Sequence, residues 1–179
     1  MKAAATAALL AAAASPAGAA LPAARFNPAA PENRQLLPAF SYATVEPVLA
    51  QIGARYRRAG ASPEKPVLHV VLPNNRTAIL SFDMCNPGGT ACKSLSIHSE
   101  WTRIANSPPE RTERAIDGFN RSFAFAKAFV APGGKPWLQR YLTADYGFVR
   151  GNLAVNLLVF AEQAESFAVK VLRPLEARR

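Results

Sequence analysis

The two cysteines of this 179-residue chain, Cys85 and Cys92, constrain its fold more than any other feature of the sequence. They flank the segment 86–91, Asn-Pro-Gly-Gly-Thr-Ala, which has the composition of a tight turn. Apolar and polar residues alternate on both sides of this turn, as they do in strands with one buried face. The sequence therefore predicts a β-hairpin over residues 79–101.

A disulfide between the two cysteines would fix the register of this hairpin. Antiparallel pairing then places Phe82 opposite Leu95. Two residues further along, Leu80 lies opposite Ile97. The polar residues pair in the same register: Ser81 with Ser96, and Asp83 with Ser94. One register thus collects the apolar side chains on one face of the hairpin.

The cysteine count also indicates the compartment. A single pair of cysteines with six residues between them suits one disulfide in an oxidising environment. A structural zinc site would need about four ligands, and a redox-active pair would have the spacing Cys-x-x-Cys. Closing so short a loop stabilises a fold by about 2–3 kcal/mol. We therefore predict a structural disulfide, Cys85–Cys92, and expect neither a metal nor a cofactor.

The N-terminus has the features of an export signal. Residues 1–19 combine a charged start at Lys2, an apolar centre rich in alanine and a small-residue end, Ala17-Gly18-Ala19, typical of a cleaved signal peptide. The apolar run is too short to span a bilayer. We expect a periplasmic or secreted protein without a membrane span. The alternative is a disordered Ala/Pro tail on a cytoplasmic protein.

The length of the chain suits one domain. A proline-rich segment without periodicity predicts a flexible lead-in at 20–40, before a single domain at 41–175 and a basic tail at 176–179. The elements predicted within the domain are a helix from its N-cap Thr44 to Gly53, strands at 55–58 and 67–72, the cysteine hairpin, a helix at 108–121 capped by Ser107, strands at 123–130 and 137–143, and a helix at 150–172 that ends before Pro174. This order, α-β-β-β-β-α-β-β-α, predicts an α+β domain with helices packed on one face of an antiparallel sheet.

The chain is basic, with 21 Lys and Arg residues against 12 Asp and Glu residues. Arg55, Arg57 and Arg58 form the densest basic group, so binding to a polyanion or to an anionic envelope surface is one hypothesis. Elsewhere the basic residues are spread singly among acidic ones, which is typical of a solvated surface and indicates no specific nucleic acid. Trp101 and Trp137 are the remaining candidate binding residues, as a ligand platform or as the edge of a core.

A catalytic site is the least favoured hypothesis. Polar residues alternate along one strand of the hairpin: Ser94, Ser96, His98 and Glu100. They include the residue types of a Ser–His–carboxylate hydrolase. Neighbours on one strand face point the same way side by side, however, whereas a triad converges in a pocket. We expect instead the polar outer face of a half-buried hairpin, without catalytic residues. His69, inside an apolar strand, is expected to be a packed or edge residue.

Several further motifs resemble those of one bacterial family. They are the cysteine pair around a Gly-bearing turn with Ser-Leu after the second cysteine, the helix end Asp117–Arg121, the strand Phe125–Phe129, the Gly-Lys-Pro turn before an aromatic-apolar strand, and a long final helix with Phe160 near its middle. In these motifs the chain resembles the YbjN family of sensory transduction regulators. The resemblance implies a fold similar to type III secretion chaperones, with no catalytic residues and no cofactor.

Asn120 and Arg121 match the family motif, and we expect structural roles for both. An asparagine at a helix C-terminus can adopt the left-handed conformation, and an arginine there complements the helix dipole. Taken together, the sequence predicts an exported, non-enzymatic YbjN-like domain that binds a protein or peptide partner and forms a homodimer. A basic polyanion or envelope-surface binder is the alternative, and a Ser/His hydrolase is a more distant one.

Overall fold

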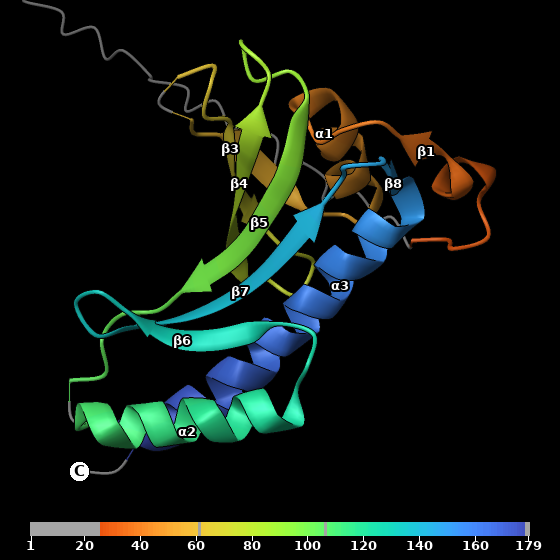
Figure 1. The fold of residues 1–179 in the computed structure, drawn as a ribbon. Helices are drawn as coiled ribbons and strands as arrows, with labels where there is room; N and C mark the ends of the chain where they lie inside the picture. Colours follow the sequence, from red (N-terminus) through yellow and green to blue (C-terminus); the bar gives the residue numbers. More distant parts are fainter. Residues whose placement is uncertain (1–25, 61, 106, 178–179) are drawn as a thin grey trace, which may run out of the picture.

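A six-stranded antiparallel sheet forms the centre of the protein (Figure 1). The computed structural model describes residues 26–60, 62–105 and 107–177, so the predicted signal peptide at 1–19 lies outside the described residues. The elements are η1 (Pro31–Arg34), β1 (Leu36–Leu37), α1 (Tyr42–Gln51), β2 (Arg55–Arg58), β3 (Val67–Val71), β4 (Thr77–Cys85), β5 (Cys92–Glu100), α2 (Pro109–Ser122), β6 (Lys127–Ala131), β7 (Lys135–Thr143), β8 (Phe148–Val149), α3 (Arg150–Phe167), η2 (Ala168–Leu172) and α4 (Arg173–Glu176). The order of strands across the sheet is β2-β3-β4-β5-β7-β6. The predicted α+β class and antiparallel sheet are confirmed.

The cysteine hairpin has the register predicted from the sequence. Cys85 pairs with Cys92, Phe82 with Leu95, and Leu80 with Ile97 along β4 and β5. The two cysteines form a disulfide. The predicted hairpin and its covalent link are therefore confirmed, and β4–β5 lies at the middle of the sheet.

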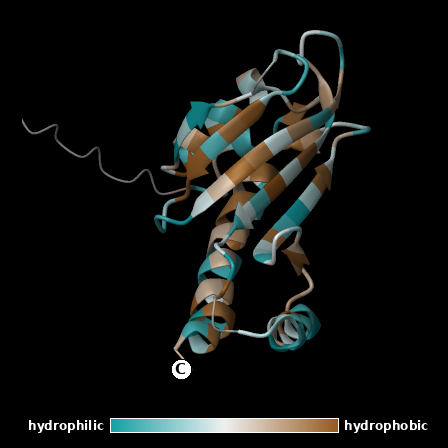
Figure 2. Cartoon of the chain, turned by 90° about the vertical axis from the view of Figure 1, so that its left-hand side faces the viewer, coloured by the Kyte–Doolittle hydropathy of each residue, from teal (hydrophilic) through white to brown (hydrophobic). Residues whose placement is uncertain are grey.

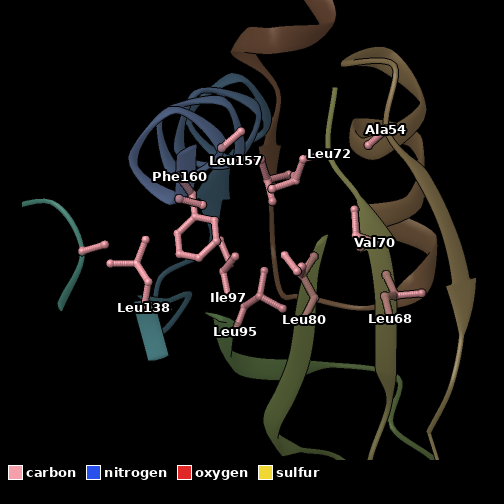
Figure 3. Packing of buried hydrophobic residues seen from close by; sticks show 14 of the residues in the cluster. Ala54, Leu68, Val70, Leu72, Leu80, Leu95, Ile97, Leu138, Leu157 and Phe160 are labelled. Carbon is pink, nitrogen blue, oxygen red and sulfur yellow. The ribbon is translucent and has the colours of Figure 1, made fainter. Parts of the chain in front are cut away.

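One face of the sheet is buried beneath helices, because each strand places every second side chain on that face. Leu68, Leu80, Ile97 and Leu138 come from four different strands and are all fully buried. Phe160 of α3 is also fully buried and packs in the same cluster (Figure 3). Burying a side chain of this size contributes about 1.5–3 kcal/mol. The alternation of apolar and polar residues along the strands is visible in Figure 2.

Helix α1 begins earlier than we predicted. Its N-cap is Ser41, whose hydroxyl accepts a hydrogen bond from the Thr44 amide, while the Thr44 hydroxyl accepts one from the Ser41 amide. Thr44 is therefore the N3 residue of a capping box, the third residue of the helix, and not the cap itself. The helix ends as predicted, since Gly53 adopts a left-handed conformation with φ of 77° directly after its C-terminal residues.

The cap of α2 and the start of β6 also differ from the prediction. Pro108 is the N-cap of α2 without a side-chain hydrogen bond. Ser107 is instead buried, and its hydroxyl accepts a hydrogen bond from Thr112 at 3.0 Å. After the helix, Phe123 does not begin a strand, because its ring stacks on Phe119 of α2 at 4.5 Å. Strand β6 starts only at Lys127.

The final helix does not stop before Pro174. The chain remains helical through the π-helical turn η2 and continues into α4, where Pro174 lies in the first turn. Pro174 has no N–H to donate to the preceding turn, and the helical path nevertheless continues through it, directly after the wider π-helical turn. None of the helices in the described part of the chain has the length and hydropathy of a membrane span.

The segment before α1, predicted to be a flexible lead-in, contains regular structure. Within the predicted lead-in, β1 pairs with β8 as a separate two-stranded sheet that the sequence did not predict. Phe40 stacks on Phe148 at 4.4 Å, and its backbone forms two hydrogen bonds with Cys92. These partners are more than fifty residues away along the chain, so local pattern does not reveal them.

Candidate binding site on the open sheet face

The face of the sheet opposite the buried cluster carries a row of polar and apolar side chains, which we call the open face. The register places one residue from each strand in this row: Arg57, His69, Ile79, His98, Gln139 and Lys127. Side chains on this face are partly or fully exposed at these positions. A partner can therefore reach residues from all six strands at once.

The open face is hollowed at the end nearest β2. A cavity of about 670 Å³ is lined there by residues of β2, β3, β4 and β5, including Arg55, Arg57, His69, Val71, Ile79 and His98. Two arginines line one side of the cavity, and apolar or aromatic side chains form much of the remaining wall. Such a combination of apolar floor and a few charged groups is typical of binding sites.

Arg57 and His69 are joined within this cavity. The guanidinium Nη2 of Arg57 lies 2.9 Å from Nδ1 of His69. Because a guanidinium only donates, Nδ1 is the acceptor and the proton of a neutral His69 imidazole lies on Nε2. His69 thus orients Arg57 along the open face, and it is half-buried in β3, the neighbour of the edge strand β2.

His98 and Trp137 form an aromatic platform beside the cavity. Their rings stack with centroids 4.8 Å apart and planes within 10°, and Phe129 lies 5.8 Å beyond Trp137. Burial lowers the pKa of His98 below its ordinary value, with Glu100 opposing this shift and His69 adding to it. The His98 imidazole is therefore held as a neutral ring, which suits stacking against an apolar or aromatic group.

The arginine group predicted as one basic cluster is divided between two faces. Arg58 lies on the other side of β2, where its guanidinium donates to both carboxylate oxygens of Glu46 at 2.7 and 2.9 Å. This hydrogen bond raises the pKa of Arg58, and the guanidinium also covers the ring of Tyr42. Arg55 and Arg57 alone reach the cavity, because successive residues of a strand point to opposite faces.

The two tryptophans are separated in the same way. Trp101 packs edge-on against Phe167, with ring centroids 5.1 Å apart, at the border of the hydrophobic core. Only Trp137 belongs to the open face. Of the five candidate binding residues, the structure therefore brings Arg55, Arg57 and Trp137 to one face and places Arg58 and Trp101 elsewhere.

The serines of β5 are not the solvated polar face that we predicted. Ser94 is 0% exposed and Ser96 is 7% exposed, because β5 is a central strand whose small side chains are covered by larger neighbours. The Ser96 hydroxyl accepts a hydrogen bond from Gln139 at 2.7 Å. Among the described residues, neither serine hydroxyl forms a hydrogen bond with His98, and no group of three or more His, Cys, Asp or Glu side chains could hold a metal ion.

Asn120 has a structural role different from the one predicted. It lies within α2 in a right-handed conformation, and its side-chain amide exchanges two hydrogen bonds of 2.8 Å with the backbone of Ala128 in β6. Arg121 is exposed in the last turn of the helix. Neither residue lies on the open face, and Asn120 connects α2 to β6.

No known protein family, curated protein or solved structure matches this chain. The resemblance to the YbjN family therefore depends on the sequence motifs alone. The residues that sequence reasoning missed at the site are His69, Val71, Ile79 and Gln139. The alternation of side chains along a strand could have revealed all four, because each occupies an open-face position in its strand.

Proposed function

We propose that the protein is a non-enzymatic binding module that takes an extended, acidic segment of another protein on its open face. The observation that supports this proposal best is the cavity in which Arg55 and Arg57 lie beside Val71, Ile79 and His98. Positive charge next to an apolar floor suits a chain in which acidic and apolar side chains occur together.

A protein segment suits this surface better than a simple polyanion. Only two arginines of the basic group reach the cavity, since Arg58 is paired with Glu46. Glu100 also borders the cavity and would repel a continuous negative charge. The stacked platform of His98 and Trp137 adds apolar area that a polyphosphate chain cannot use.

The proposed setting is outside the cytoplasm. The disulfide Cys85–Cys92 is consistent with an oxidising compartment, and residues 1–19 have the composition of a signal peptide. We include in the proposal the YbjN-like family membership, the chaperone-like fold and the periplasmic location. The α+β order with a long final helix supports the first two.

A defined peptide tests the function. The probe is a fluorescein-labelled peptide of four Glu-Val repeats, and its anisotropy is measured against the mature protein. The double substitution Arg55→Glu/Arg57→Glu should weaken binding at least about tenfold, because it replaces attraction by repulsion on the open face. The matched control is Arg34→Glu/Arg114→Glu, which makes the same change in net charge at exposed positions outside the cavity and should leave binding unchanged.

Two results would overturn the proposal. If both double variants weaken binding equally, net charge rather than the open face attracts the peptide. If polyphosphate binds as tightly as the Glu-Val peptide and both affinities fall steeply with salt concentration, the protein is a polyanion binder. A four-repeat Glu-Gly peptide separates the cases further, since loss of the valine side chains should weaken binding to a site that contacts them and should leave binding by charge alone unchanged.

A further inference from the structure

The two edges of the six-stranded sheet differ in their hydrogen bonding. At the β6 edge, the side-chain amide of Asn120 accepts from the Ala128 amide and donates to the Ala128 carbonyl, both at 2.8 Å. The asparagine thereby occupies the outward-facing backbone groups of Ala128, and α2 lies alongside β6 (Figure 1). An edge that is occupied at Ala128 and flanked by a helix is less accessible to an added strand than a bare edge.

The β2 edge has free backbone groups. The Ala59 amide donates to the Val67 carbonyl at 2.9 Å, so odd-numbered residues of β2 bond to β3. The N–H and C=O groups of Tyr56 and Arg58 therefore point away from the sheet. In the parts of the chain that the structure describes, these groups have no hydrogen-bond partner, and all four β2 residues are exposed.

We propose that the acidic segment adds to β2 as a further strand of the sheet. This inference rests on the proposed function and assigns its binding mode. Main-chain hydrogen bonds to Tyr56 and Arg58 would supply affinity, while the side chains beside them would select the sequence.

The side chains of β2 define the pattern of this segment. Residues of the added strand that point to the open face lie next to Arg55 and Arg57, so acidic side chains fit there. Residues that point to the other face lie next to Tyr56, which is 38% exposed, and next to Arg58, whose charge is already paired with Glu46. Alternating acidic and apolar residues therefore complement β2.

A second copy of this chain fits the same edge poorly. Two β2 strands side by side would bring the arginines at 55, 57 and 58 of one copy next to those of the other. Like charges directly opposite each other destabilise a strand pair. The charge of β2 therefore favours an acidic partner over edge-to-edge dimerisation.

N-methylation of the peptide tests strand addition without altering the protein. Methyl groups are placed on the nitrogens of all glutamates in one Glu-Val peptide and of all valines in another. In an added strand only alternate N–H groups face β2, so one of the two peptides should lose at least about tenfold in affinity and the other should bind like the parent.

A variant of β2 provides the complementary measurement. Tyr56→Pro removes an N–H that points away from β3, and edge strands tolerate proline at such positions. It should weaken binding of the Glu-Val peptide, whereas Tyr56→Ala, which keeps the N–H, should weaken it less. Near-ultraviolet circular dichroism checks that both variants remain folded, and the methylated peptides test the proposal should Tyr56→Pro unfold.

The outcomes separate this inference from the proposed function. Equal affinities of the two methylated peptides would overturn strand addition, and a dependence on Arg55 and Arg57 would then leave the proposed function intact. A parent peptide that does not bind at all would overturn both. Protection from hydrogen exchange gained at the amides of Tyr56 and Arg58 on peptide binding would support the assigned edge.

Discussion

Asn120→Ala is the most direct test of how the sheet is closed at β6. The substitution removes both hydrogen bonds between the side-chain amide and the backbone of Ala128, each 2.8 Å long. Ala128 is only 3% exposed, so water replaces these bonds incompletely. A typical intramolecular hydrogen bond contributes about 0.5–1.5 kcal/mol, and buried groups left unpaired cost more. We therefore expect a loss of about 2–3 kcal/mol in the free energy of unfolding.

Urea denaturation with the disulfide intact measures this loss, and an unchanged m-value would show that only stability has changed. Arg121→Ala is the matched control, because Arg121 is the next residue of the same helix and is exposed. A surface substitution of this kind changes stability by less than about 0.5 kcal/mol.

Equal free energies of unfolding for Asn120→Ala and Arg121→Ala would contradict the role assigned to Asn120. Such a result would mean that the backbone of Ala128 finds other partners at no cost, and that α2 docks on β6 through apolar contacts alone. The contrast between the two edges of the sheet would then lose its basis, even if the affinity for an acidic peptide were confirmed.

Two further predictions concern the hairpin and the open face. Replacing Cys85 and Cys92 with serine should lower the free energy of unfolding by about 2–3 kcal/mol, and equal urea midpoints of the variant and the parent would contradict this. In a nuclear magnetic resonance titration, the pKa of His98 should lie below its ordinary value, and Glu100→Gln should lower it further by removing the opposing charge; a rise would refute the assigned cause. The pKa of His98 is lower in the folded state than in the unfolded state. The stability that this difference contributes is therefore complete above the unfolded pKa of about 6.5 and is lost as the pH falls. His98→Gln should therefore lose less stability than the parent between pH 7 and pH 5 in urea denaturation.

The central hairpin could be predicted in detail because its constraints are local. Two cysteines and a turn select a register, and only that register places the apolar residues of both strands on one face. The same applies to the end of α1 at Gly53, where the left-handed conformation favours glycine. In these places the information lies within a few residues of the element that it determines.

The division of the arginines could also have been predicted from the sequence. In a strand over 55–58, Arg55 and Arg57 share a face and Arg58 takes the other. Three arginines within four residues form a dense group along the chain, but the strand period of two divides them between the two faces of the sheet. The ion pair of Arg58 with Glu46, in contrast, depends on how α1 packs and has no local signal.

The remaining errors arise from contacts between distant segments. The burial of Ser94 depends on β7, which pairs with β5 only after some forty residues and an intervening helix. The role of Asn120 depends on the backbone of a strand that follows its helix. A side-chain amide can cap a helix or substitute for a strand neighbour with the same two hydrogen bonds, so the residue type alone does not distinguish these roles.

The open edge and the basic charge of β2 have one physical explanation. An unprotected edge strand invites pairing with further strands, including those of other copies, and charged side chains on the edge oppose this. Arg55 and Arg57 oppose pairing with other copies, and neither forms a salt bridge among the described residues. Their unpaired charges also attract an acidic strand. Protection from self-association and selection of a partner then follow from one set of side chains, whereas β6, covered by Asn120, carries a single basic residue, Lys127.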